Sequence, residues 1–249
     1  MTDWHPGSNL EERLKTLLIP PRVYIKNKLK RELKHGEREL ALIPFLVDRD
    51  KICLDIGANT GVYSELMSRY CNKVLAFEPN PKIYATLQRC AAHNVECHQI
   101  ALSDKDGNAE LRIPRTKKGH SNQGGSLSTV KVSDNFDVIE VTTTRLDSLD
   151  LGVIGFIKID VEGYELNVLQ GARDTIARDR PTLLIELEER HTGQPLETLV
   201  SAVESYSYRC LFLEKGKLCS FETMDIDRYH RHPAIREEYV FNFLFLPVD

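Results

Sequence analysis

Features that define whole classes of protein are missing from this sequence. No apolar run approaches the roughly 18 residues that a membrane-spanning helix requires, and the opening MTDWHPGSNLEERLK lacks the apolar core of a signal peptide. The six cysteines form no CxxC pair and show no metal-like spacing with histidine. We therefore expect a soluble protein of the reducing cytoplasm, without transmembrane segments or structural disulfides.

An excess of positive charge is missing too. The formal net charge is −4, which argues against a protein-wide surface for nucleic acid. Only residues 22–38 are locally basic, with seven lysines and arginines against two glutamates. Such a run is typical of a solvated helix face, and peripheral contact with an anionic glycolipid is the alternative.

What the sequence does contain is a regular alternation of strand and helix patterns. This alternation predicts right-handed crossovers and a doubly wound, mostly parallel α/β sheet. An antiparallel hairpin is expected near the C-terminus, and we expect residues 1–48 to form a helical extension in front of a domain at 49–249. The five apolar runs that we expect to form the core strands lie at 51–57, 73–79, 95–104, 155–160 and 181–189.

The stretch LDIGANTGVYS places two glycines in a turn between a strand and a helix. Gly57 and Gly61 flank Ala58 and Asn59, and the missing side chains allow backbone N–H groups to approach a ligand. Asp55, just before the turn, would repel a pyrophosphate but attract a cationic ligand. The loop therefore favours a nucleoside-like cofactor with a positive charge, and its glycines lack the GxGxxG spacing of a dinucleotide-dependent oxidoreductase.

Two later strand ends carry acids as well. Glu78, followed by Pro79, lies about 20 residues beyond the glycine turn, where a carboxylate can accept both hydroxyls of a ribose; capping of the next helix is the alternative. Ser103 and Asp104 end the third apolar run, and we expect Asp104 beside the adenine, with a simple turn as the alternative. These acids meet where open α/β sheets bind ligands.

The motifs DIGANTGVYS, VLAFEPNP, IALSDKDG, TRLDSL and IKIDVEGYELNVLQGA occur in this order, and together they resemble the FkbM-type methyltransferase family over residues 51–190. The resemblance implies a class I Rossmann-like sheet, S-adenosylmethionine as cofactor, and O-methylation, often of sugar or glycan hydroxyls. It also implies that the 55–61 loop holds the methionine portion of the cofactor, Glu78 the ribose, and Ser103 with Asp104 the adenine.

The segment IKIDVEGYE places three acids after the fourth strand. Asp160 terminates the strand across from the expected methyl position and is our leading candidate for a general base on the acceptor hydroxyl. Glu162 precedes Gly163 in a loop that faces the pocket, and catalytic and structural roles stay open for it. Glu165 falls in the first turn of the next helix, where an acid complements the helix dipole.

The neighbouring strand, IELEERH, offers further polar groups. Glu186 and Glu188 alternate onto one face and are candidates for substrate contact, and the resemblance supports Glu186. His191 is an alternative general base. A second mechanism has Asp160 with Glu162 or Glu186 hold magnesium or manganese. We favour the metal-free route because no ligand spacing is diagnostic.

A polar, glycine-rich segment, KKGHSNQGGSLST, interrupts the alternation at 117–129. We expect it to close over the active site, with His120 and Asn122 bonding sugar hydroxyls; a plain surface loop is the alternative. The predicted function is methyl transfer to a hydroxyl of a sugar in a glycan or glycolipid precursor. The alternatives are O-methylation of a polyketide-type product and a non-catalytic glycan- or cofactor-binding relative. Oligomeric state stays open, with a homo-oligomer as one option.

Overall fold

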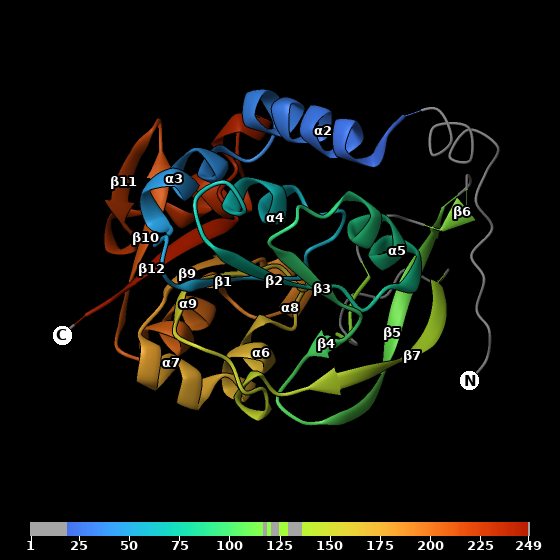
Figure 1. Cartoon of the computed structure of the whole chain (residues 1–249). Coiled ribbons are helices and arrows are strands. Elements are labelled where there is room, and N and C mark those ends of the chain that lie inside the picture. The colour runs from blue at the N-terminus through green and yellow to red at the C-terminus, as the bar shows by residue number, and fades with distance from the viewer. Residues whose placement is uncertain (1–18, 117–118, 121–124, 129–135, 249) are drawn as a thin grey trace.

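The structure, a computed structural model of the chain, describes residues 19–116, 119–120, 125–128 and 136–248. Its core is an eight-stranded sheet in the order β11-β10-β12-β9-β8-β1-β2-β3 (Figure 1). In chain order, the strands of this sheet are β1 (Ile52–Ile56), β2 (Lys73–Phe77), β3 (Val95–His98), β8 (Ile154–Ile159), β9 (Thr182–Glu186), β10 (Tyr208–Glu214), β11 (Lys217–Ser220) and β12 (Asn242–Pro247).

The strand directions confirm the fold class expected from the sequence. β3, β2, β1, β8 and β9 run parallel to one another, whereas β12 lies antiparallel between β9 and β10. β10 and β11 form the expected hairpin, and Lys215 and Gly216 in its two-residue turn both have positive φ, as such turns require. This is the doubly wound, mostly parallel α/β sheet that the sequence predicts.

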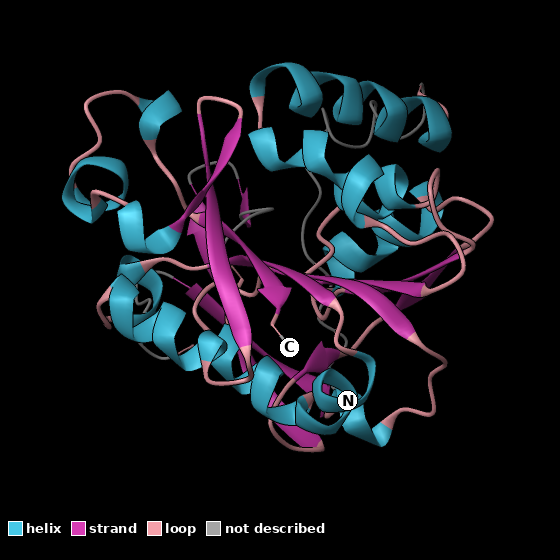
Figure 2. Ribbon diagram, turned by 90° about the vertical axis from the view of Figure 1, so that its left-hand side faces the viewer, coloured by secondary structure: helices cyan, strands magenta, loops and turns pink. Residues whose placement is uncertain are grey.

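Helices cover both faces of the sheet, as Figure 2 shows. The upper face in Figure 1 carries α2 (Pro21–His35), η1 (Arg38–Leu42), α3 (Ile43–Leu46), α4 (Val62–Met67) and α5 (Pro81–Cys90). The lower face carries α6 (Glu165–Gly171), α7 (Arg173–Asp179) and α9 (Leu196–Glu204). The short turns are η2 (Leu146–Ser148), α8 (Glu189–Thr192), η3 (Phe221–Thr223), η4 (Asp227–Arg231) and η5 (Arg236–Glu238).

Each buried strand places apolar side chains on both faces of the sheet, which explains why helices pack on both faces. Cys53 and Phe156 join the apolar cluster beneath α2, η1 and α4, whereas Leu54 and Ile157 join the cluster against α6, α7 and α9. Because successive side chains of a strand point to opposite faces, each buried strand supplies both layers. Among the residues that the structure describes, no helix combines the length and the apolar character needed to cross a bilayer.

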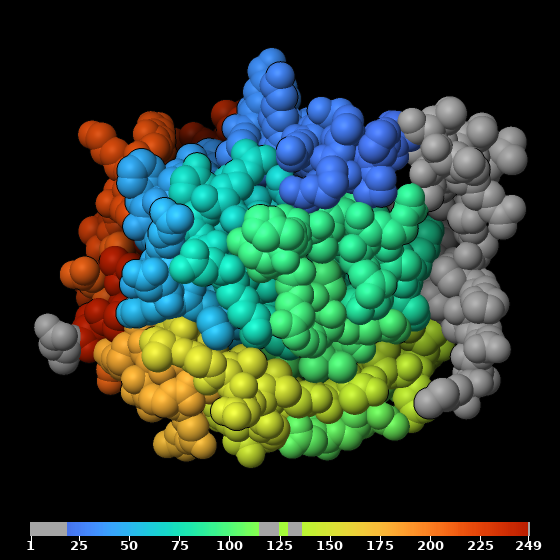
Figure 3. Space-filling view, in the orientation of Figure 1, coloured from blue at the N-terminus to red at the C-terminus, as the bar shows by residue number. Residues whose placement is uncertain are grey.

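The basic N-terminal segment forms α2, which lies across α4 and α5 (Figure 3). Ile25 and Leu29 are buried beneath it, while four of its basic residues are exposed: Lys26, Lys30, Arg31 and Lys34. This confirms the solvated helix face expected from the charge pattern. Gly36 follows the helix, and η1 and α3 continue the segment toward β1.

Two predicted elements are wrong. Residues 95–104 are not one strand: β3 ends at His98, and β4 (Ala101–Leu102) joins a second sheet with β7 (Phe136–Thr144), β5 (Gly107–Thr116) and β6 (Gly119–His120), in the order β4-β7-β5-β6. Ala101 turns away because it packs into the apolar cluster of that second sheet. The sequence also predicts one helix over residues 165–178, but the structure divides it into α6 and α7 at Ala172.

Candidate active site

The carboxyl ends of β1, β2, β8 and β9 open into a cavity of about 1060 Å³. Its walls comprise the turn after β1, the acidic end of β2 and the residues that follow β8 and β9. Several residues between 28 and 40, from α2 and η1, complete the wall. The cavity thus lies at the edge where open α/β sheets bind ligands.

The glycine turn after β1 is pressed against the end of β8. Gly57 and Gly61 have φ of 79° and 89°, in the left-handed region that only glycine adopts without strain. A side chain at Gly57 would overlap the carbonyl oxygen of Asp160. The turn and the acidic end of β8 are therefore in direct backbone contact, and the turn, with Ala58 and Asn59, lines the cavity.

Glu78 at the end of β2 is a buried carboxylate fixed by backbone groups. Its two oxygens accept hydrogen bonds of 2.9 Å each, from Asn59 N and from Asn80 N. Burial raises the pKa of Glu78 to about 7. The cap of α5 is Asn80, whose side chain accepts from Lys82 N at 3.0 Å, so the alternative of Glu78 as that cap is wrong. Glu78 and the adjacent Pro79 line the cavity.

Asp55 is also buried at the cavity wall. The Ser64 hydroxyl donates a short hydrogen bond to its Oδ2, and burial raises the pKa of Asp55 to about 6. Two carboxyls with raised pKa values thus face the region in which the sequence predicts the cofactor.

Asp160 lines the cavity directly after β8. Its backbone N–H donates to Ile56 O at 2.9 Å, which continues the parallel pairing with β1. Within the part of the chain that the structure describes, nothing donates a hydrogen bond to the Asp160 carboxylate. Burial raises the pKa of Asp160 to about 7; Lys158 acts against this rise, and Glu37 and Glu162 add to it.

Lys158 is a site residue that the sequence analysis missed. It lies on β8 two residues before Asp160, hence on the same face of the sheet, and is 1% exposed. Its ammonium group donates to Asn242 Oδ1 at 2.8 Å. Burial lowers the pKa of Lys158, but Asp160, Glu37 and other carboxylates outweigh burial and leave it above the ordinary value. A lysine inside the apolar run FIKI was the available signal, because lysine is rarely buried without a partner.

The structure brings together three of the predicted polar residues. One ligand atom each from Glu162, Glu186 and His191 lies within 4.8 Å of the others, and His191 Nε2 is 3.1 Å from Glu162 Oε2. His191 is 4% exposed and lies behind the cavity wall, which includes both glutamates. Burial and the Asp160 charge raise the pKa of Glu186 well above its usual range. Asp160 does not belong to this group.

Two other predicted acids have structural partners. Glu165 begins α6, as expected, and its Oε1 accepts from Gly163 N at 2.9 Å and from Val161 N at 3.2 Å. It therefore holds the loop that carries Glu162. Glu188 lines the cavity but is paired with Arg190 and accepts the Tyr239 hydroxyl.

Ser103 and Asp104 do not line the cavity, which is bounded instead by Ile100, Ala101 and Leu102, and Ser103 Oγ donates to Asp104 Oδ1 at 2.9 Å. Their role at the adenine stays a prediction. The same holds for the 117–129 segment. Asn122 lies outside the described residues, and the backbone of His120 belongs to β6.

Known proteins support the methyltransferase resemblance. The sequence profile of the methyltransferase FkbM domain matches residues 55–214. Methyltransferase 1 of Beauveria bassiana is 30% identical over an alignment of 148 residues that covers 50% of this chain and 59% of that protein. The 2-O-methyltransferase NoeI of Sinorhizobium fredii is 26% identical over 189 residues, 66% of this chain and 76% of its own.

The hexuronic acid methyltransferase AglP of Haloferax volcanii is 26% identical over 151 residues, 59% of this chain and 60% of that protein. The chain thus matches less than two thirds of the length of two of these three relatives. Among solved structures, a methyltransferase FkbM from Methylobacillus flagellatus shares 18% identity at a TM-score of 0.49, over 79% of this chain and 43% of its own. On the match of the domain profile to well over half of its residues, the chain belongs to the FkbM methyltransferase domain family.

Proposed function

We propose that the protein transfers a methyl group from S-adenosylmethionine to a sugar hydroxyl. The observation that carries this proposal is the contact between the glycine turn and Asp160. Gly57 has no room for a side chain against the Asp160 backbone carbonyl, and both residues line the cavity, so a ligand held by the turn would lie beside Asp160. Cofactor and base thereby meet at one point of the cavity.

The residues around the turn fit the cofactor. Both oxygens of Glu78 are oriented by backbone N–H groups, and each keeps a further lone pair for a ribose hydroxyl. The buried Asp55 carboxyl suits the cationic methionine portion, and the left-handed Gly57 and Gly61 leave room for its close approach. When bound, S-adenosylmethionine supplies the electrophilic methyl group.

The chain's own contribution to the reaction is orientation and proton removal. The cavity walls exclude water and hold the acceptor oxygen in line with the methyl group, which lowers the entropic part of the barrier. A carboxylate oxygen of Asp160, free of hydrogen bonds from the described residues, takes the hydroxyl proton. Lys158 lies on the same sheet face, and its positive charge favours the ionised form of Asp160.

A sugar acceptor is supported by two relatives, whose names specify 2-O-methylation and hexuronic acid methylation. The cavity is polar, as a sugar requires, and it is lined by cations from several elements, among them Arg31, Lys34, Arg38 and Arg236. The same wall carries ten aspartates and glutamates, so its charge sets no preference for an anionic acceptor. A polyketide-type acceptor is the second candidate, and a non-catalytic role the third, although none of the predicted cofactor acids has been lost.

The test is an assay with methyl-labelled S-adenosylmethionine and a panel of acceptors. The panel contains free sugars, uronic acids, nucleotide sugars, lipid-linked glycans and macrolide aglycones. We expect label on a sugar oxygen, located by mass spectrometry. Label on nitrogen or on an aglycone would overturn the sugar assignment, and failure to bind S-adenosylmethionine in a calorimetric titration would overturn the proposal as a whole.

A further inference from the structure

Glu162, Glu186 and His191 come from three different segments. Glu162 follows β8, Glu186 ends β9, and His191 lies in α8. Their ligand atoms lie within 4.8 Å of one another. A divalent ion with ligands at about 2.1–2.2 Å holds those ligands roughly 3 to 4.4 Å apart, so small side-chain rotations bring all three onto one ion.

Glu186 supplies an independent reason for a ligand here. Its side chain is 9% exposed, yet no residue that the structure describes gives its carboxylate a hydrogen bond or an ion pair. Of the two nearby cations, Arg190 pairs with Glu188 and Lys158 donates its hydrogen bond to Asn242, so Lys158 acts on Glu186 only through its charge and without a direct contact. A buried carboxylate without a hydrogen bond or a direct ion pair is unfavourable unless a bound cation compensates its charge.

The loop that carries Glu162 is fixed in position. Glu162 has a φ of 57°, a left-handed conformation that the surroundings must enforce. Ser126 Oγ donates to Glu162 O at 2.6 Å. A side chain at Gly163 would overlap the backbone carbonyl of His191. The two ligand-bearing backbones are therefore packed directly against each other.

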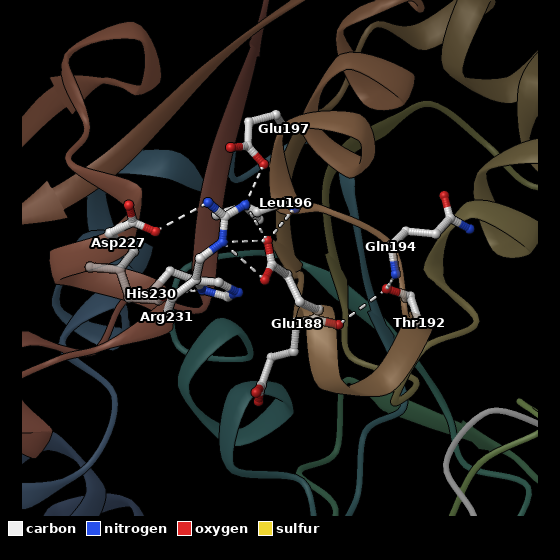
Figure 4. Close-up of polar contacts among 10 residues, drawn as sticks. Glu188, Thr192, Gln194, Leu196, Glu197, Asp227, His230 and Arg231 are labelled. Atoms are coloured by element: carbon white, nitrogen blue, oxygen red, sulfur yellow. Dashed lines mark hydrogen bonds and ion pairs between the residues drawn. The ribbon is translucent and has the colours of Figure 1, made fainter.

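The helix that carries His191, α8, is held in position by the ion pairs of Arg231. Figure 4 shows Arg231 between Asp227 and Glu197, with ion pairs of 3.2 and 2.8 Å. The same guanidinium group contacts Glu189 of α8 at 2.7 Å. Arg231 thus ties α8, the helix that carries His191, to η4 and α9, while His191 Nε2 lies 3.1 Å from Glu162 Oε2.

We propose that Glu162, Glu186 and His191 bind a divalent cation, with manganese as the best fit. Two carboxylate oxygens with one imidazole nitrogen suit manganese, whereas magnesium prefers oxygen ligands alone. Because both glutamates line the cavity and His191 lies behind its wall, the open coordination positions face the cavity. On the proposed function, a pair of acceptor hydroxyls occupies them. The site differs from the one expected from the sequence, since His191 takes the place of Asp160.

The test is manganese binding to the full chain after treatment with EDTA, without cofactor or acceptor. Calorimetry is expected to show one Mn²⁺ per chain, and pulsed electron paramagnetic resonance to show coupling to an imidazole nitrogen. Glu186→Gln weakens binding by about tenfold or more, and His191→Gln removes the nitrogen coupling. The control is Glu39→Gln, which changes another buried acid of the cavity wall and leaves binding intact.

A thermal melt separates loss of binding from loss of fold. Mn²⁺ raises the melting temperature of the wild type but not of Glu186→Gln. Without metal, the variant melts no lower than the wild type, because the amide keeps the shape of a carboxyl that accepts no hydrogen bond from the described residues. The proposal is overturned if the wild type binds no Mn²⁺ at millimolar concentration, or if Glu186→Gln binds it equally well. Neither readout needs methyl transfer, so an inactive protein that binds Mn²⁺ refutes only the proposed function. Unchanged transfer in EDTA refutes only the role toward the acceptor.

Discussion

The buried ammonium group of Lys158 donates a 2.8 Å hydrogen bond to the side-chain oxygen of Asn242. The amide nitrogen of Asn242 donates in turn to Glu37 Oε2 at 2.9 Å, and the Tyr63 hydroxyl donates to the same oxygen at 2.6 Å. Lys158 also lies over the Tyr63 ring, 5.2 Å from its centre. One cation thus connects β8 and β12 with the segment between α2 and η1 that bounds the cavity.

Replacing this cation should destabilise the fold. Lys158→Met leaves the carboxylates of Glu37 and Asp160 without their buried counter-charge, and removing one partner of such a set costs about 3 kcal/mol or more. Urea unfolding measures the loss. The control is Lys73→Met, which removes an exposed pair with Glu96 and should change stability by no more than about 1 kcal/mol. Equal stability of Lys158→Met and wild type would contradict a stabilising role for the cation.

Asp160→Asn should abolish turnover while the affinity for S-adenosylmethionine stays within a few-fold. The amide keeps the shape of the side chain but cannot take the proton, a loss of about 10²- to 10⁴-fold for a general base. Single-turnover rates and calorimetry measure the two quantities separately. Asp150→Asn, at an exposed position, is the matched control. Methylation by Asp160→Asn at the wild-type rate would show that Asp160 has no catalytic role.

The affinity for S-adenosylmethionine should rise with pH through about 7. Burial raises the pKa of Glu78 to about 7 in the free protein, and only the ionised carboxylate accepts both ribose hydroxyls. Below that pKa, binding must first remove a proton, so the dissociation constant at pH 6 should exceed its plateau value by about tenfold. Calorimetry between pH 6 and 8 tests this, and Glu78→Gln should bind weakly with a flat profile. A variant that keeps the wild-type slope would assign the titration to another group.

Gly57→Ala and Gly216→Ala form a matched pair. Both glycines have φ near 80°, so alanine costs about 1 kcal/mol in conformational strain at either position. Nothing lies within 4 Å of a side chain at Gly216, whereas at Gly57 it would overlap Asp160. Only Gly57→Ala should therefore weaken S-adenosylmethionine binding strongly, as measured by calorimetry, while Gly216→Ala binds normally. Normal binding by both variants would argue against the close contact of turn and strand end.

Local sequence pattern was enough to locate the strands of the large sheet and the acids at their ends. The apolar runs before Asp55, Glu78 and Asp160 each formed a parallel strand, because such runs lose the most by remaining in water. The run at 95–104 did not form one strand, because Ala101 is buried in the apolar cluster of the second sheet and β4 therefore joins that sheet. No local sequence pattern predicts that β4 leaves the large sheet.

The sequence by itself determined the α/β sheet, the glycine turn and the acidic strand ends, since each depends on residues close together in the chain. Only the tertiary structure decided that Glu37 contacts Asn242, 205 positions away, and that His191 joins Glu162 and Glu186. These contacts arise where packed elements bring distant side chains within a few ångströms. The physical reason is that the spacing of apolar residues along the chain determines whether a segment buries them as a strand or as a helix. Contacts between side chains of different elements depend instead on how those elements pack.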